Sequence, residues 1–195
     1  MDNIPDQQRR RALRLRDFDY AQTAAYFVTV CTYRRACLFG DVTDGKMLLH
    51  DPGRIVQAAW QALPEHYPHV RVDAFVVMPN HVHGIVILAP KDSVGAGLAG
   101  AGWKPAPTES STIARRHGLP EIVRAFKTFS ARRVNAARAA PGTPLWQRNY
   151  YEHVVRDADE LNRIREYIDL NPVQWAMDRE NPRNTVGAGF KPARS

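Results

Sequence analysis

VRVDAFVVMPNHVHGIVIL, residues 70–88, is the stretch of sequence that most strongly predicts the fold. Apolar, β-branched and aromatic residues fill Val70 to Met78 and again His81 to Leu88, a pattern that predicts two strands. Only Pro79 and Asn80 separate them, so we expect a tight turn that makes the two strands antiparallel neighbours. The second strand also holds the two residues best suited to chemistry.

The remaining elements are strands interspersed with helices. β-branched runs, proline positions and the helical spacing of apolar residues locate them. They are a strand from 25 to 33, a hairpin with its turn at Asp44-Gly45, a helix from Pro52 closed by Pro64 and Pro68, a helix from 120 to 138, a strand-like stretch from 145 to 156, and a helix capped by Asp157 and ended by Asn171-Pro172. This order, with helices long enough to cover a sheet face, predicts the α+β class: an antiparallel β-sheet with helices packed on it.

Length and composition predict one domain with appended segments. The chain has 195 residues, of which 44% are hydrophobic, enough for one ordinary core. We expect that domain at 21–178, after a basic arm at 1–20 and before a flexible tail at 179–195. An aperiodic stretch rich in Gly, Ala and Pro at about 90–116 indicates a long insertion rather than core.

The charge balance indicates a polyanionic partner. Lys and Arg number 27 against 20 Asp and Glu, which gives a net charge of +7 and a pI near 9.7. This excess favours nucleic acid, although charge alone does not separate DNA from RNA or from an anionic membrane. No apolar run approaches the roughly 20 residues of a membrane span, and the polar N-terminus lacks a signal-peptide core. We therefore expect a cytoplasmic protein with no membrane partner.

Two groups of basic residues are candidate DNA-binding surfaces. Side chains of the N-terminal arm could lie along phosphates, although a solvated tail is the alternative, and the helix at 120–138 has a basic side. The candidates are Arg9, Arg10, Arg11, Arg14 and Arg16 in the arm, and Lys127, Arg132 and Arg133 on the helix.

His81 and His83 form a candidate metal site. Because side chains alternate along a strand, both imidazoles lie on one face and Val82 lies on the other. Two imidazoles at this spacing can bind one divalent ion, with Mg²⁺ or Mn²⁺ as candidates if oxygen donors complete the site. The alternative is a pair of ordinary sheet histidines with protein partners.

The last helix offers both an oxygen donor and a nucleophile. Tyr167 and Asn171 are four residues apart and therefore share one helix face, at the edge of its apolar stripe. A tyrosine hydroxyl is a weak nucleophile at its ordinary pKa, so it needs a target made electrophilic by a cation. Tyr167 could equally be a half-buried helix residue. Tyr150 and Tyr151 compete for the role, although packing or base stacking explains that pair more simply.

Three motifs in this order resemble a known family. MPNHVHGIVI at 78–87, WQRNYYEHVVR at 146–156 and REYIDLNP at 165–172 are similar to motifs of the transposases associated with repetitive extragenic palindromes (REP-associated tyrosine transposases). These are single-tyrosine enzymes related to the small insertion-sequence transposases. The stretches RLRDFDY at 14–20 and YFVTVCT at 26–32 are similar too. The resemblance covers most of residues 9 to 177.

This resemblance implies a ferredoxin-like sandwich of the kind found in histidine-hydrophobic-histidine nucleases. It also implies a metal-dependent enzyme that cuts single-stranded DNA at a hairpin through a 5′-phosphotyrosine link and can rejoin strands, acting as a monomer or homodimer. His81 and His83 would be metal ligands, Asn171 the third ligand and Tyr167 the nucleophile. The rival functions are a binding module that stacks single-stranded bases without cutting them, and a metal-dependent nucleotide hydrolase. A third histidine at position 85 would favour the hydrolase, but Ile85 stands there.

The two cysteines, Cys31 and Cys37, flank a predicted strand end. Neither belongs to a Cys-x-x-Cys pattern, and a reducing compartment keeps thiols unpaired. We interpret both as packing residues.

A near-repeat links the insertion to the tail. GAGWKPAPT at 100–108 resembles VGAGFKPARS at 186–195, and codons for such a segment can be written as an inverted repeat. Our hypothesis is that both segments are translated mobile palindromes, inserted where extra residues are tolerated. The alternative is two Gly/Pro segments that are alike by composition.

The gene sequence tests this hypothesis directly. We expect complementary arms around both segments, because a mobile palindrome keeps its hairpin in the coding strand. Codons without such arms at either place would reject the hypothesis in favour of similar composition alone.

Overall fold

A computed structural model of the chain describes residues 23–89, 117–178 and 180–183. The N-terminal arm with its arginines, the insertion at 90–116 and most of the tail lie outside the described residues. The expectations for these three segments therefore remain predictions. None of the described helices is long and apolar enough to cross a membrane.

Four antiparallel strands form the central sheet, in the order β4-β5-β1-β6. The predicted pairing of the strands at 70–78 and 81–88 is confirmed, and the Met78 N–H donates to the His81 carbonyl, 2.8 Å away, to close the turn. The strand at 25–33 is confirmed as the neighbour of β5 on its other side. The strands are β4 (Val70–Val77), β5 (His81–Leu88), β1 (Ala24–Cys31) and β6 (Tyr151–Val155).

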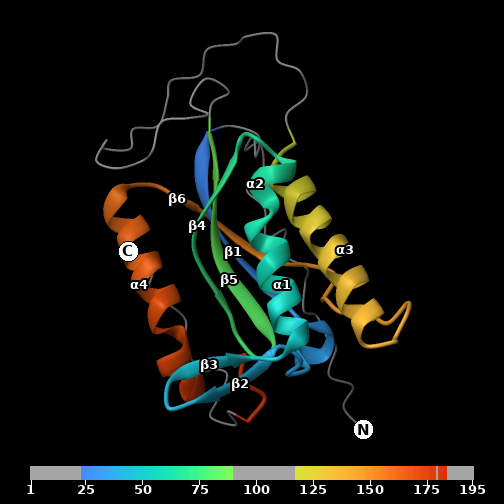
Figure 1. The fold of residues 1–195 in the computed structure, drawn as a ribbon. Helices are drawn as coiled ribbons and strands as arrows, with labels where there is room; N and C mark the ends of the chain where they lie inside the picture. The colour runs from blue at the N-terminus through green and yellow to red at the C-terminus, as the bar shows by residue number, and fades with distance from the viewer. Residues whose placement is uncertain (1–22, 90–116, 179, 184–195) are drawn as a thin grey trace, which may run out of the picture.

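Helices cover both faces of this sheet, as Figure 1 shows. On one side lie α1 (Asp51–Gln61), the short α2 (Leu63–His66) and α3 (Leu119–Ala137); on the other lies α4 (Ala158–Gln174). The main core fills the space between the sheet and α1 and α3, and a smaller apolar cluster packs beneath α4. The α+β sandwich expected from the sequence is confirmed.

A separate two-stranded hairpin lies near the C-terminal end of α4 (Figure 1). It consists of β2 (Gly40–Thr43) and β3 (Lys46–Leu49). Its turn at Asp44 and Gly45 is where the sequence predicts it, and both residues have positive φ, 52° and 69°. A two-residue turn with positive φ at both positions matches the twist of paired strands.

Three local expectations are wrong. Pro64 lies in the first turn of the helix α2 instead of closing an element, because proline is tolerated at that position. Of the stretch at 145–156, only Tyr151–Val155 is a strand, and Trp146 makes an isolated bridge with Thr32. Pro172 does not end the last helix.

The chain stays helical beyond Pro172. α4 continues to Gln174 and passes into a 3-10 turn, η3 (Trp175–Met177). Pro172 lies inside α4 and has no N–H, so the helix lacks the one hydrogen bond that this position would otherwise make to the Ile168 carbonyl. The Trp175 N–H bonds to the Pro172 carbonyl, and this tighter pattern is common at helix ends.

Gly84 is the residue of the histidine strand β5 that faces the aromatic rings of the main core. A Cβ atom at this position would lie 2.4 Å from the Trp60 ring and 2.9 Å from the Phe75 ring. Those two rings stack with centroids 4.7 Å apart, and the edge of Phe126 meets Trp60 at 5.1 Å. Glycine therefore allows α1 to approach β5 closely.

We expect Gly84→Ala to lower the free energy of unfolding by about 1–3 kcal/mol, because the added methyl group overpacks this contact. Urea denaturation followed by circular dichroism measures the change. In a Trp60→Phe background the smaller ring leaves room, so the cost of the alanine should fall by half or more. A neutral Gly84→Ala in the parent chain would contradict this account of the packing.

Candidate metal and tyrosine site

His81 and His83 lie side by side on the sheet face that α4 covers. Both are buried, and their Nε2 atoms are 3.0 Å apart. The spacing in β5 brings them to one face, as the alternation of side chains requires. Two ring nitrogens aimed at one point are an arrangement that a shared cation can stabilise.

Each imidazole is held through its other nitrogen. His81 Nδ1 lies 2.9 Å from Asn80 Oδ1, and His83 Nδ1 lies 2.8 Å from Thr29 Oγ1. Asn80 uses its Nδ2 to donate to the carbonyls of Arg35 and Glu180, so its Oδ1 is the acceptor that faces His81. His81 therefore carries its proton on Nδ1 and presents a lone pair on Nε2. Such partners set ring orientation in metal sites.

Both imidazoles are neutral at physiological pH. Burial lowers the pKa of His83 to about 3. Burial also lowers the pKa of His81 well below its usual value, and electrostatic repulsion from His83 and from Arg35 would act in the same direction if His81 took up a proton. The neutral imidazole is the form that binds a metal ion.

Asn171 and Asp178 add oxygen atoms to the two histidines. Asn171 is buried on α4, and its Oδ1 makes no hydrogen bond in the described part of the chain. Its amide nevertheless acts on His81, where it partly offsets the lowering of the pKa. Asp178 Oδ2 lies 3.9 Å from His81 Nε2, and ligand atoms of His81, His83 and Asp178 all lie within 4.8 Å of one another.

This donor set fits a divalent cation. Two neutral imidazoles, a carboxylate and a buried amide oxygen with no hydrogen-bond partner among the described residues offer nitrogen and oxygen ligands with a net negative charge. An unpaired buried oxygen costs free energy unless something binds it, and a cation would satisfy it. The structure thus supports a metal-binding group at this place.

The structure brings Tyr167 to the same place. Its hydroxyl lies 3.3 Å from His83 Nε2, although 84 positions separate the two residues in the chain. The Arg165 guanidinium donates to both carboxylate oxygens of Asp73 on β4, at 2.8 and 2.6 Å, and so anchors α4 to the sheet. This bidentate pair also keeps the pKa of Asp73 below its usual value.

Aromatic side chains surround the tyrosine. Phe27 on β1 stacks on His83 with centroids 5.4 Å apart, and its ring meets those of Tyr167 and Tyr151 edge-on at 6.0 and 6.2 Å. Tyr151 is thus a packing partner of Phe27 with its outer side exposed, as expected for packing or stacking. The Tyr167 hydroxyl, unlike that of Tyr151, lies at hydrogen-bonding distance from His83 in the described part of the chain.

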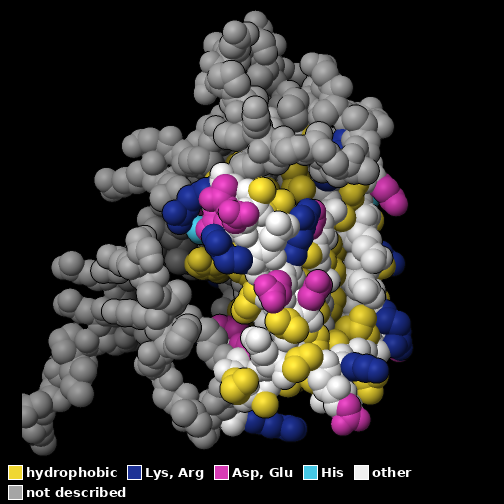
Figure 2. Space-filling view, turned by 90° about the vertical axis from the view of Figure 1, so that its left-hand side faces the viewer, with side chains coloured by type: hydrophobic (Ala, Val, Ile, Leu, Met, Phe, Trp, Pro, Cys, Tyr) yellow, Lys and Arg dark blue, Asp and Glu magenta, His cyan; other side chains and the backbone are white. Residues whose placement is uncertain are grey.

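The outward surface of α4 is mixed in character. Figure 2 views the molecule from this side and shows acidic and basic side chains interspersed, with hydrophobic side chains exposed between them. The exposed apolar residues of α4 and η3 are Tyr167, Leu170, Val173 and Met177. The described part of this face is therefore not a uniform basic patch.

The basic residues predicted on the helix at 120–138 lie away from the histidines. α3 packs on the opposite face of the sheet (Figure 1), where Arg132 and Arg133 are exposed. Lys127 has a structural partner: its amine donates to the carbonyls of Gln147 and Arg148, and burial lowers its pKa. DNA contact by these three side chains remains a prediction, as it does for the arm arginines outside the described residues.

Sequence reasoning missed Asp178, Asn80 and Thr29. The helix was expected to end at Pro172, so nothing marked Asp178, six residues later, as part of a site. Asn80 was interpreted only as a turn residue, although its place before His81 is a usable signal. Thr29 is opposite His83 in the β1–β5 register, and register cannot be deduced from the two strands separately.

Comparison with known proteins gives the following relatives. An uncharacterized protein of Haemophilus influenzae is 37% identical over 171 residues, which span 87% of this chain and 92% of the relative. A second protein of that organism, assigned by name to the REP-associated tyrosine transposases, is 25% identical over 156 residues, or 80% of this chain and 74% of the relative. No protein-family profile matches the chain.

The fold has a relative among solved structures. The structure of a REP-associated tyrosine transposase bound to a REP hairpin aligns with a TM-score of 0.52 at 19% identity, over 83% of this chain and 73% of that one. The resemblance stated from the sequence motifs is confirmed, and the likeness in structure supports the fold.

We expect Thr29→Val to weaken Mn²⁺ binding about 10-fold, because His83 loses the partner that orients its ring. Isothermal titration calorimetry measures the dissociation constant. Valine keeps the branched shape, so the melting temperature should change little. Thr43→Val, in the β2–β3 hairpin, is the matched control and should bind Mn²⁺ as the parent does, because among the interactions of the described residues Thr43 has none with the histidines. If Thr29→Val binds Mn²⁺ with unchanged affinity, Thr29 does not orient His83 for metal binding.

Proposed function

Because this chain belongs to one family with the 37% identical Haemophilus influenzae protein and has the fold of a REP-associated tyrosine transposase, we propose that it is a transposase-like DNA strand-cutting enzyme. Its substrate is hairpin DNA with a single-stranded flank, and Tyr167 is its nucleophile. The observation that carries the proposal is the 3.3 Å approach of the Tyr167 hydroxyl to a pair of buried, neutral imidazoles.

His81, His83 and Asn171, together with Asp178, would hold the metal ion, for which Mg²⁺ and Mn²⁺ are the candidates. When bound, the ion would polarise a non-bridging phosphate oxygen and make the phosphorus more electrophilic. Tyr167 and Asn171 stand one turn apart on α4, so the nucleophile and this ligand are positioned by one rigid element.

The reaction balances without a further reactant. The Tyr167 oxygen forms a bond to phosphorus while the bond from phosphorus to the 3′-oxygen breaks. The phenol loses its proton, and the departing 3′-oxygen gains one. The products are a 5′-phosphotyrosine link and a free 3′-hydroxyl. Since one phosphodiester replaces another, the 3′-hydroxyl can attack in reverse and rejoin strands.

Charge supports DNA as the partner. The net charge of +7 favours a polyanion, and the relative whose fold matches was solved with a REP hairpin. For this chain, the phosphate contacts are assigned to the arm residues Arg9, Arg10, Arg11, Arg14 and Arg16 and to Arg132 and Arg133, with Lys127 as a further candidate. Each phosphate contact that is lost should lower the salt dependence of binding.

A labelled hairpin with a single-stranded flank tests the proposal on a denaturing gel. With Mn²⁺ or Mg²⁺ the full-length chain should cut the DNA and retain one fragment as a covalent protein–DNA band. Tyr167→Phe and the double variant His81→Ala, His83→Ala should each lose about 1000-fold or more in rate, because groups that act as one unit are each nearly indispensable.

Tyr151→Phe is the matched control, since it removes a neighbouring hydroxyl but keeps the ring; its covalent band should persist. A band that survives in Tyr167→Phe and disappears in Tyr151→Phe would reassign the nucleophile. Hairpin binding without any cleavage by the parent chain would favour the binding module instead.

A further inference from the structure

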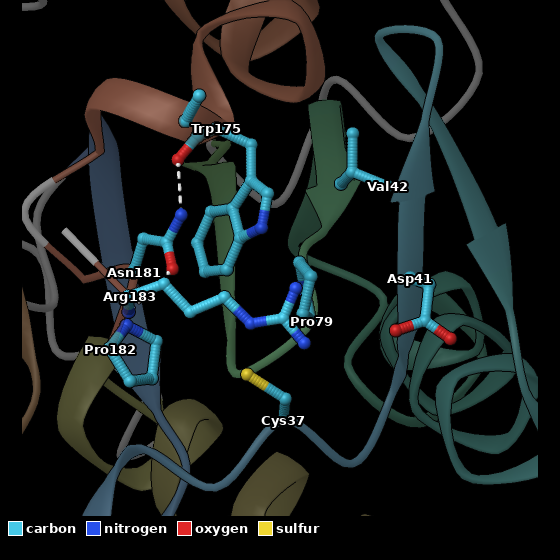
Figure 3. Close-up of a pocket in the computed structure, with 9 residues that line it drawn as sticks. Cys37, Asp41, Val42, Pro79, Trp175, Asn181, Pro182 and Arg183 are labelled. Atoms are coloured by element: carbon cyan, nitrogen blue, oxygen red, sulfur yellow. Dashed lines mark hydrogen bonds between the residues drawn. The ribbon is translucent and has the colours of Figure 1, made fainter.

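A pocket of about 450 Å³ opens beside the metal site (Figure 3). It lies between the β2 strand, the loop that precedes this strand, and the segment that follows α4. The lining residues central to the argument are Cys37, Pro79, Trp175 and Arg183. The volume is within the range of small-ligand sites, roughly 300–1000 Å³.

The pocket and the candidate metal site share a wall. The Trp175 ring, which lines the pocket, has its centroid 6.0 Å from that of His81. Pro79, on another side, is two residues before His81 in the chain. A strand whose phosphate reached the histidines would therefore have its neighbouring nucleotide beside this pocket.

The wall beyond Trp175 is held in place by hydrogen bonds. Asn181 Nδ2 donates to the Trp175 carbonyl at 2.9 Å, and Asn181 Oδ1 accepts from the Arg183 N–H at 2.9 Å. The Asn181 N–H donates to the Asp178 carbonyl at 3.1 Å. The segment that contributes Asp178 to the metal site thus also positions the pocket residues.

The chemistry of the pocket suits a nucleotide. Trp175 offers an aromatic face on which a base can stack, and the prolines at 79 and 182 add apolar surface. The Arg183 side chain extends into the pocket toward Pro79 (Figure 3), and its guanidinium makes no ion pair with a carboxylate of the described residues. A flexible cation beside an aromatic ring can meet the phosphate of the same nucleotide.

Cys37 was interpreted from the sequence as a packing residue, but it is exposed and lines this pocket. Desolvation raises the pKa of its thiol. It therefore contributes part of a binding surface rather than a core contact.

We infer that this pocket binds one unpaired nucleotide next to the scissile phosphate, with its base on Trp175 and its phosphate at Arg183. The inference rests on the proposed function, because the position of the nucleotide follows from a phosphate at the histidines. At this pocket the protein would contact one nucleotide of the single-stranded flank directly.

Fluorescence anisotropy with the full-length Tyr167→Phe chain tests the inference, since binding is then measured without a covalent step. The DNA is a hairpin with a single-stranded flank, presented intact and with one abasic site at each flank position in turn. We expect a single position near the cut at which base removal weakens binding about 10-fold, the scale of one stacked base.

In the Tyr167→Phe background, Trp175→Ala should also weaken binding of the intact DNA about 10-fold. It should not weaken binding further when the DNA already lacks the base that stacks on Trp175. Arg183→Ala, an exposed substitution that should leave folding intact, should lower the salt slope by about 0.7 on flanked DNA and leave a hairpin without a flank unchanged. Met177→Ala, on the same 3-10 turn but outside the pocket, is the matched control and should bind every DNA normally.

The inference would be overturned if Trp175→Ala weakened the binding of every abasic DNA equally, or weakened the binding of the hairpin without a flank. An unchanged salt slope in Arg183→Ala would show that Arg183 does not contact a phosphate. If the parent chain cuts hairpins but these effects on binding are absent, only the inference about the pocket is rejected. If the effects are present but the parent chain never cuts DNA, only the proposed cutting function is rejected.

Discussion

Two imidazole Nε2 atoms held 3.0 Å apart in a buried part of the sheet are the constraint around which this structure is organised. Burial keeps both rings neutral, and Asn80 and Thr29 hold their Nδ1 atoms, so the remaining nitrogens are aimed at one point. The strand register sets this arrangement, because it places Thr29 directly opposite His83. A slip of one residue would turn both histidines to the other face of the sheet.

The other parts of the fold bring oxygen atoms to that point. α4 crosses the histidine face and carries both Tyr167 and Asn171, and the bidentate pair of Arg165 with Asp73 anchors it to β4. Helical structure beyond Pro172 then brings Asp178 back toward His81 and places Trp175 between the candidate metal site and the neighbouring pocket. One continuous segment, from α4 to residue 183, therefore supplies most of the chemistry that the sheet does not.

Local patterns predicted the parts of the structure that depend on local physics. Runs of β-branched and aromatic residues predicted the strands, the Asp44-Gly45 pair predicted the hairpin turn, and the i, i+4 spacing paired Tyr167 with Asn171. The sequence could not show that α4 would pass through Pro172, because tertiary contacts decide whether a proline ends a helix. For the same reason Asp178, the Thr29 contact and the exposed position of Cys37 were missed: each depends on segments far apart in the chain meeting in space.

The central claim is that a strand-borne histidine pair and a tyrosine from a distant helix act on one cation. Anomalous diffraction from crystals of the full chain soaked with Mn²⁺ tests it most directly. We expect one strong anomalous peak at bonding distance from His81 Nε2 and His83 Nε2, with an oxygen of Asn171 or Asp178 completing the ligands and the Tyr167 hydroxyl beside them. A peak bound elsewhere, or no peak at the histidines at saturating Mn²⁺, would contradict the claim.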